Sequence, residues 1–76
     1  MNELEFIALV KEKRNKKGIS QKQLSKLTYI PQVALCKIEN GNQKLTFEQI
    51  RILSIILDID LNEIKSESIK IHNYYD

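Results

Sequence analysis

The stretch SQKQLSKLTYIPQVALCKIENG, residues 20–41, decides the fold of this chain. It reads as a short helix, a break, a second short helix and a stop at Asn40-Gly41. Ser20 followed by Gln23 has the spacing of a capping box. Pro31 suits the first position of the second helix, because its missing N–H has no intrahelical partner there. The stretch therefore predicts one helix over about 21–27 and another from Pro31 to the Asn40-Gly41 stop.

The capping-box spacing recurs three more times along the chain. The three pairs are Asn2 with Glu5, Thr46 with Gln49, and Asp60 with Glu63. They predict further helices over about 3–16, 47–57 and 61–65. The expected fold is all-α, a compact five-helix bundle over residues 1–65. Residues 66–76 form a tail that is a short strand, a helix extension or a mobile segment, and it is either disordered or used in dimerisation.

The length and composition of the chain bound its class. Seventy-six residues make one domain with a small core. There is no apolar run near the ~18 residues of a membrane span, and the acidic start does not fit a signal peptide. Ser20 has no His–Asp companions, and His72 has no second His or Cys beside it. We therefore expect a cytoplasmic protein with no enzymatic activity, no metal and no cofactor.

The charge is unevenly distributed along the chain. Residues 1–10 carry two acids, residues 11–51 carry ten bases and three acids, and residues 52–76 carry two bases and five acids. The net charge of the middle block is thus +7, within a chain of net charge +2. A basic block of this kind favours a polyanionic partner such as nucleic acid, although an ordinary solvated surface gives the same pattern. Two or three phosphate contacts are expected among Lys11, Lys13, Lys16, Lys17, Lys22 and Lys44.

The second helix of the opening stretch has two different faces. Leu35 and Ile38 lie three residues apart and form the side that faces a core. At 100° per residue, the opposite side carries Gln32, Val33, Cys36, Lys37 and Asn40. The major groove of DNA is about 12 Å wide and admits one α-helix. An exposed helix face on a basic surface is what a reader of that groove requires.

A wider set of positions has the spacing of a known family: Arg14, Gly18-Ile19-Ser20-Gln21, Leu24, Thr28, Ile30, Gln32, Leu35, Ile38-Glu39-Asn40-Gly41, Leu53, Leu57, Leu61 and Ile64. Through these residues the chain resembles the lambda-repressor and Cro type of helix-turn-helix domain, the Xre-like family of bacterial and phage regulators. The resemblance covers about residues 4–65. It implies a five-helix bundle in which the second and third helices form the DNA-reading unit.

The resemblance also implies roles for individual residues. Base edges would be read by Gln32, Val33, Cys36 and Lys37. Phosphates would be bound by Gln21, Asn40, Gln43 and Lys44, to which the basic block adds Lys22. Arg14 and Glu39 match a pair that is commonly a partly buried salt bridge in this family.

Three departures from the family pattern matter. The family usually has Gly at the position of Tyr29, where a left-handed backbone costs any other residue about 1–2 kcal/mol. Either the turn differs here or packing of the Tyr29 ring offsets this cost. Pro31 replaces the usual Ser or Thr cap. The reading face is poor in polar groups, because Val33 and Cys36 cannot make bidentate base contacts.

The helix over 47–57 carries an additional apolar stripe. Ile50, Leu53 and Leu57 form its core side. Ile52 and Ile55, with Ile56 between the two stripes, stand where the family usually has polar residues. Such a surface invites burial, either in a homodimer or beneath the tail through Ile69 and Ile71.

The sequence thus predicts a dimeric DNA-binding transcriptional regulator, a repressor or autoregulator on an inverted-repeat operator. The alternative is a protein-interaction module of the same fold that binds a toxin or a larger regulator and reads DNA weakly or not at all.

Overall fold

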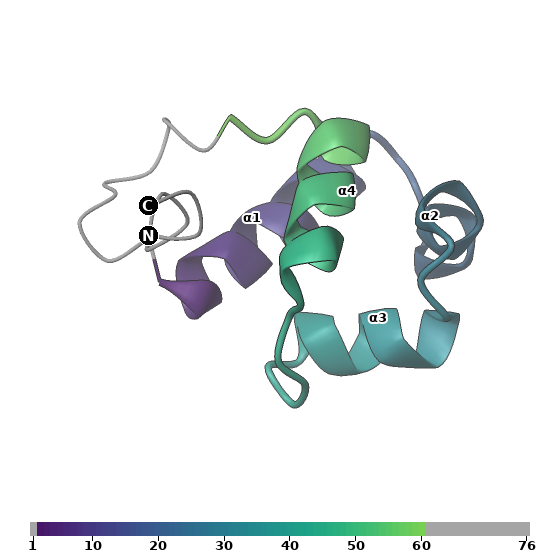
Figure 1. Ribbon diagram of the computed structural model, residues 1–76. Helices are drawn as coiled ribbons and strands as arrows, with labels where there is room; N and C mark the ends of the chain where they lie inside the picture. Colours follow the sequence, from purple (N-terminus) through teal and green to yellow (C-terminus); the bar gives the residue numbers. More distant parts are fainter. Residues whose placement is uncertain (1, 61–76) are drawn as a thin grey trace.

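The computed structural model describes residues 2–60 of the chain (Figure 1). These residues form four helices and no strand, so the all-α expectation is confirmed for this part. The helices are α1 (Glu3–Lys16), α2 (Gln21–Thr28), α3 (Gln32–Glu39) and α4 (Phe47–Leu57). Four helices are therefore described in place of the five expected. The fifth predicted helix, 61–65, and the tail 66–76 lie outside the described residues.

Capping boxes begin three of the four helices, as predicted. The Asn2 side chain accepts a hydrogen bond from the Glu5 amide at 2.8 Å, and the Glu5 carboxylate accepts from the Asn2 amide at 2.9 Å. The pairs at the start of α2 and α4 are built in the same way. The fourth expected pair involves Glu63, which lies outside the described residues.

Helix α3 begins one residue later than predicted. Pro31 occupies the N-cap position with φ −55° and ψ 142°, and α3 starts at Gln32. Proline has no side-chain acceptor, so this helix has no side-chain cap, in contrast to the other three. The expectation that Pro31 is the first helical residue was wrong, because its ψ angle is extended rather than helical.

Each helix is followed closely by a residue in the left-handed backbone region. Glycine occupies this position after α1 and α3, where Gly18 has φ 69° and Gly41 has φ 76°. After α4 the residue is Asp58, and after α2 it is Tyr29, with φ 56° and 62°. Left-handed residues close helices because the next amides can then reach back to free carbonyls.

Tyr29 adopts the left-handed conformation without packing of its ring. The backbone keeps the left-handed conformation that the family's glycine implies, and the ring does not offset the strain, since the residue is 91% exposed. The neighbours fix the turn instead. The Tyr29 amide donates to the Ser25 carbonyl at 2.8 Å, the Ser25 hydroxyl donates to the Ile30 carbonyl, and Ile30 is buried. Both alternatives drawn from the sequence were wrong at this residue.

The core lies where the four helices meet. Its largest fully buried side chains are Phe6 and Val10 of α1, Leu24 of α2, Leu35 and Ile38 of α3, and Leu53 and Leu57 of α4. Burying one such side chain stabilises a fold by about 1.5–3 kcal/mol. Helix α3 packs on α1 and α2 and runs along the lower edge of the molecule in Figure 1. One side of α3 therefore faces the core and the other faces solvent.

An ion pair joins the end of α1 to the end of α4. Lys17 Nζ donates to Asp58 Oδ2 at 2.8 Å. The hydrogen bond and the charge of Lys17 lower the pKa of Asp58, and the charge of Lys13 adds to this effect. Aspartate also tolerates the left-handed backbone better than most residues, which suits Asp58 to this position.

Candidate nucleic-acid interface

The four residues predicted to read bases all lie on the solvent side of α3. Gln32, Val33, Cys36 and Lys37 are exposed, and Val33 is 68% exposed. The other side of the helix is fully buried at Leu35 and Ile38. The helix therefore presents two polar and two apolar side chains outward on a rigid backbone. A surface of this kind can contact base edges and thymine methyl groups.

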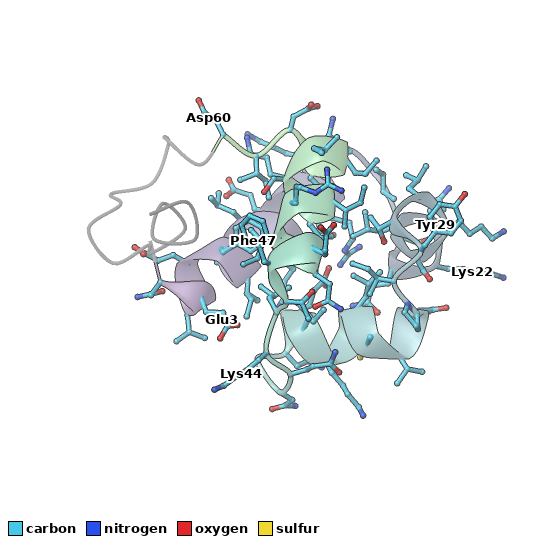
Figure 2. All side chains as sticks on the ribbon, in the orientation of Figure 1. Glu3, Lys22, Tyr29, Lys44, Phe47 and Asp60 are labelled. Atoms are coloured by element: carbon cyan, nitrogen blue, oxygen red, sulfur yellow. The ribbon has the colours of Figure 1, made fainter. Side chains whose placement is uncertain are left out.

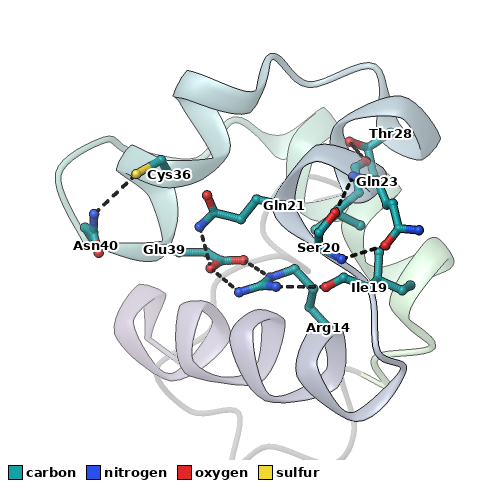
Figure 3. A network of polar contacts seen from close by, with 10 residues as sticks. Arg14, Ile19, Ser20, Gln21, Gln23, Thr28, Cys36, Glu39 and Asn40 are labelled. Atoms are coloured by element: carbon teal, nitrogen blue, oxygen red, sulfur yellow. Dashed lines mark hydrogen bonds and ion pairs between the residues drawn. The ribbon is translucent and has the colours of Figure 1, made fainter.

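Two of the predicted DNA contacts are hydrogen-bonded to each other. The side-chain Nδ2 of Asn40, at the C-cap of α3, donates to Cys36 Sγ at 3.6 Å (Figure 3). Sequence reasoning placed Cys36 among the base readers and Asn40 among the phosphate contacts, and did not pair them. Their i, i+4 spacing was the available signal. Both residues are exposed.

A buried polar network lies behind α3 and joins three helices (Figure 3). Arg14 Nε donates to Glu39 Oε2 at 2.8 Å, and Arg14 Nη2 donates to Glu39 Oε1 at 3.1 Å. Arg14 Nη1 also donates to the Ile19 carbonyl at 2.8 Å. The side chains of Arg14 and Glu39 are 14% and 1% exposed. This bidentate pair fixes α1, the α1–α2 connection and α3 relative to one another.

Gln21 belongs to this network, which the sequence did not predict. Its Nε2 donates to Glu39 Oε1 at 3.0 Å, across 18 residues of sequence. Gln21 is half-buried as the first residue of α2. One of the expected phosphate contacts is thus already held by a carboxylate inside the protein.

The segment after α3 carries two more predicted phosphate contacts. Lys44 is exposed and Gln43 is half-buried. The Leu45 amide donates to Glu3 Oε2 at 2.9 Å, so the start of α1 anchors this segment. No sequence signal pointed to Glu3, because the two residues are 42 positions apart.

Three basic residues of the basic block, residues 11–51, are paired with carboxylates among the described residues 2–60. Arg14 pairs with Glu39, Lys17 with Asp58, and Arg51 with Glu48. Lys17 was one of the candidate phosphate contacts, and its ammonium is held at the far end of α1 and α4. Lys22, Lys37 and Lys44 form no ion pair within residues 2–60. In Figure 2, Lys22 projects from α2 and Lys44 from the segment after α3.

The apolar stripe of α4 is less exposed than expected. Ile55 is 56% exposed, whereas Ile52 and Ile56 are half-buried and pack against the core. Ile52 and Ile55 were both expected to be exposed; Ile55 is exposed, and Ile52 is not. The sequence also did not predict the exposure of Tyr29, which stands beside an open cleft of about 370 Å³.

Within the described part of the chain, no group of three or more His, Cys, Asp or Glu side chains is arranged to hold a metal ion. None of the helices in residues 2–60 combines the length and the apolar character needed to cross a bilayer.

Comparison with known proteins agrees with this geometry. A model of the helix-turn-helix family matches residues 10–64 of the chain. The "ImmF control region 10 kDa protein" of Bacillus phage phi105 is 30% identical over 64 residues, which cover 84% of this chain and 71% of the phage protein. No solved structure gives a significant match. The chain belongs to the helix-turn-helix family of the Cro/C1 type, the family that its sequence resembles.

Proposed function

We propose that this protein is a DNA-binding transcriptional regulator that places α3 in the major groove of an inverted-repeat operator. The observation that carries the proposal is the division of α3 into a fully buried side at Leu35 and Ile38 and an exposed side at Gln32, Val33, Cys36 and Lys37. Membership of the helix-turn-helix family supports DNA as the partner.

Two kinds of contact with DNA would have different roles. Phosphate contacts from Gln21, Lys22, Asn40, Gln43 and Lys44 would set the register of the protein on the duplex. Gln32 would pair with adenine N6 and N7, Lys37 would donate to guanine, and Val33 would touch a thymine methyl group. Cys36 would fill the space between these contacts.

A homodimer would present two copies of α3 to successive major grooves, about 34 Å apart. Ile55 is the exposed centre of the proposed contact, with Ile52 and Ile56 beside it. Burying a large aliphatic side chain contributes about 2 kcal/mol. The polar neighbours Glu48 and Arg51 would then lie at the rim of the contact.

The similarity to a phage control-region protein supports a regulatory role. A repressor or autoregulator in a phage or bacterial setting fits both this similarity and the small size of the domain.

The test is selection of bound duplexes from a random pool, repeated with Gln32→Ala and Lys37→Ala. Wild type is expected to enrich an inverted repeat, and each variant is expected to relax the preference at one position of each half-site. Lys44→Ala is the matched control, because a phosphate contact affects affinity without altering the preferred sequence. Failure of the wild type to enrich any motif would refute specific reading.

A protein-interaction module is the second candidate, and the surface around Tyr29 favours it. Tyr29 is 91% exposed and stands beside a cleft that Pro31, Arg51 and Ile52 also line. Exposed aromatic side chains next to pockets are enriched at protein interfaces. Salt dependence separates the two functions, since duplex binding weakens steeply between about 50 and 200 mM salt and an apolar protein contact does not.

A further inference from the structure

The orientation of the Gln21 side chain is dictated by the residue that it faces. Glu39 accepts from Arg14 Nε and Nη2 and from Gln21 Nε2, at 2.8, 3.1 and 3.0 Å. A carboxylate with no proton accepts hydrogen bonds and donates none. The Gln21 atom that faces Glu39 must therefore be the nitrogen, because the amide oxygen would be repelled.

Gln21 also stands where a helix has free donors. In the first turn of α2, the Ser20 hydroxyl accepts from the Gln23 amide at 3.0 Å, and the Leu24 amide donates to the Ser20 carbonyl at 2.9 Å. The backbone amides of Gln21 and Lys22 have no acceptor inside the helix. A phosphate at this end would meet these two N–H groups and the Gln21 side chain together.

A side-chain amide helps at such a place only in one orientation. Phosphate oxygens accept and do not donate, so Gln21 can bind a phosphate through an N–H and not through its amide oxygen, which lies on the side of the amide away from Glu39 (Figure 3). The Gln21 nitrogen carries two hydrogens, and the bond to Glu39 uses one. A side chain that is already held in its bound orientation loses less conformational freedom on binding.

We propose that Glu39 is a positioning residue for DNA binding, which holds the Gln21 amide so that its second N–H serves the phosphate at the start of α2. Glu39 touches no DNA itself and acts through Gln21. This inference rests on the proposed function, and it adds a binding role to the structural pair that Glu39 forms with Arg14.

The test is a cycle of four proteins: wild type, Gln21→Met, Glu39→Asp and the double variant. Methionine keeps the length of the side chain and removes the amide. Aspartate keeps a negative charge opposite Arg14. Its side chain is shorter by one carbon–carbon bond, about 1.5 Å, so its carboxylate lies too far from Gln21 for a hydrogen bond. Binding to a duplex of random sequence is measured in about 50 mM salt, after circular dichroism has shown that each variant is folded at the assay temperature.

Gln21→Met is expected to weaken binding about tenfold, which is the loss of one hydrogen bond to a charged group. Glu39→Asp is expected to weaken binding of the wild-type background severalfold and to have no further effect in the Gln21→Met background. The salt dependence stays unchanged in both variants, because neither removes a positive charge. Lys22→Met is the contrasting control, because it removes a positive charge. In this variant the slope of log binding constant against log salt concentration should fall in magnitude by about one.

Equal weakening by Glu39→Asp in both backgrounds would overturn the proposal, because Glu39 would then act on the fold and not through Gln21. Unchanged binding by Gln21→Met would overturn it as well. A wild-type protein that binds no duplex in this buffer would refute the proposed function and the inference with it. In the free protein, one of the two Gln21 side-chain amide protons should be shifted away from the ordinary glutamine range and should exchange slowly with water, and both effects should be lost in Glu39→Asp.

Discussion

Replacing Arg14 by Met should remove a large part of the stability of this protein. Arg14 supplies two of the three donors to Glu39, whose side chain is 1% exposed. In the variant the buried carboxylate keeps one neutral donor from Gln21. Breaking a buried pair in this way costs about 3–5 kcal/mol. A domain of 76 residues has a free energy of unfolding of about 4–11 kcal/mol at 0.05–0.15 kcal/mol per residue.

Urea denaturation followed by far-UV circular dichroism measures this loss directly. Arg51→Met is the matched control, because its pair with Glu48 is exposed, at 54% and 76%, and spans one helical turn at 3.1 Å. That variant should lose less than about 0.5 kcal/mol. A loss below about 1 kcal/mol in Arg14→Met would refute the reasoning, because the pair would then behave as a surface pair.

The double variant Arg14→Met with Glu39→Met separates two explanations of the loss. Removing both charges leaves no unpaired buried carboxylate, and an apolar replacement of a buried pair is often neutral. The double variant should therefore be more stable than Arg14→Met alone. A double variant that is less stable would show that packing of the two side chains, and not the stranded charge, accounts for the loss.

Three further outcomes are expected. Tyr29→Gly should raise the free energy of unfolding by about 0.5–1 kcal/mol in urea denaturation, because release of the left-handed strain exceeds the added freedom of the unfolded chain; Tyr29→Ala should give no such gain. The stability advantage of wild type over Asp58→Asn in thermal melts should be present at neutral pH, begin to fall as the pH drops below about 4, and be lost only below the lowered pKa of Asp58. This follows because Lys17 lowers the pKa of Asp58, so the folded state loses this contribution as the pH falls through the lowered pKa, while asparagine keeps the left-handed backbone. Ile55→Lys should abolish any concentration-dependent rise in molar mass in sedimentation equilibrium.

Much of the fold was predictable because its signals are local. Each capping box fixes a helix start within four residues, and the glycines after α1 and α3 fix two helix ends. The exposed face of α3 followed from helical periodicity alone. The Arg14–Glu39 pair was reached through the family resemblance, because nothing local joins residues 25 positions apart.

The features that were missed depend on tertiary contacts. The turn at Tyr29 is fixed by the burial of Ile30, which the sequence indicated as an apolar residue that pins the turn, and by the bond from the Ser25 hydroxyl to the Ile30 carbonyl, which it did not indicate. The bonds from Gln21 to Glu39 and from Leu45 to Glu3 join distant segments. Burial of Ile52 depends on the rotation of α4 about its own axis, which periodicity places only within a broad apolar face.

The composition of the reading face bears on why a dimer would be needed. Of its four residues, Gln32 and Lys37 can hydrogen-bond to base edges, and one good pair discriminates by about 1–3 kcal/mol. With these two contacts a single domain would discriminate by about 2–6 kcal/mol, which reaches only the lower part of the about 4–10 kcal/mol by which specific regulators prefer their site over random DNA. Two half-sites would give about 4–12 kcal/mol, which spans that range.

Specificity of this protein should accordingly depend on self-association more than on any one base contact. An Ile55→Lys variant that is monomeric should show an operator-to-random affinity ratio near the square root of the wild-type ratio, because one half-site supplies half of the discrimination. Binding to random duplex should fall as well, since half of the phosphate contacts are lost. An operator-to-random ratio equal to that of wild type in a demonstrated monomer would show that one copy of α3 carries the whole recognition.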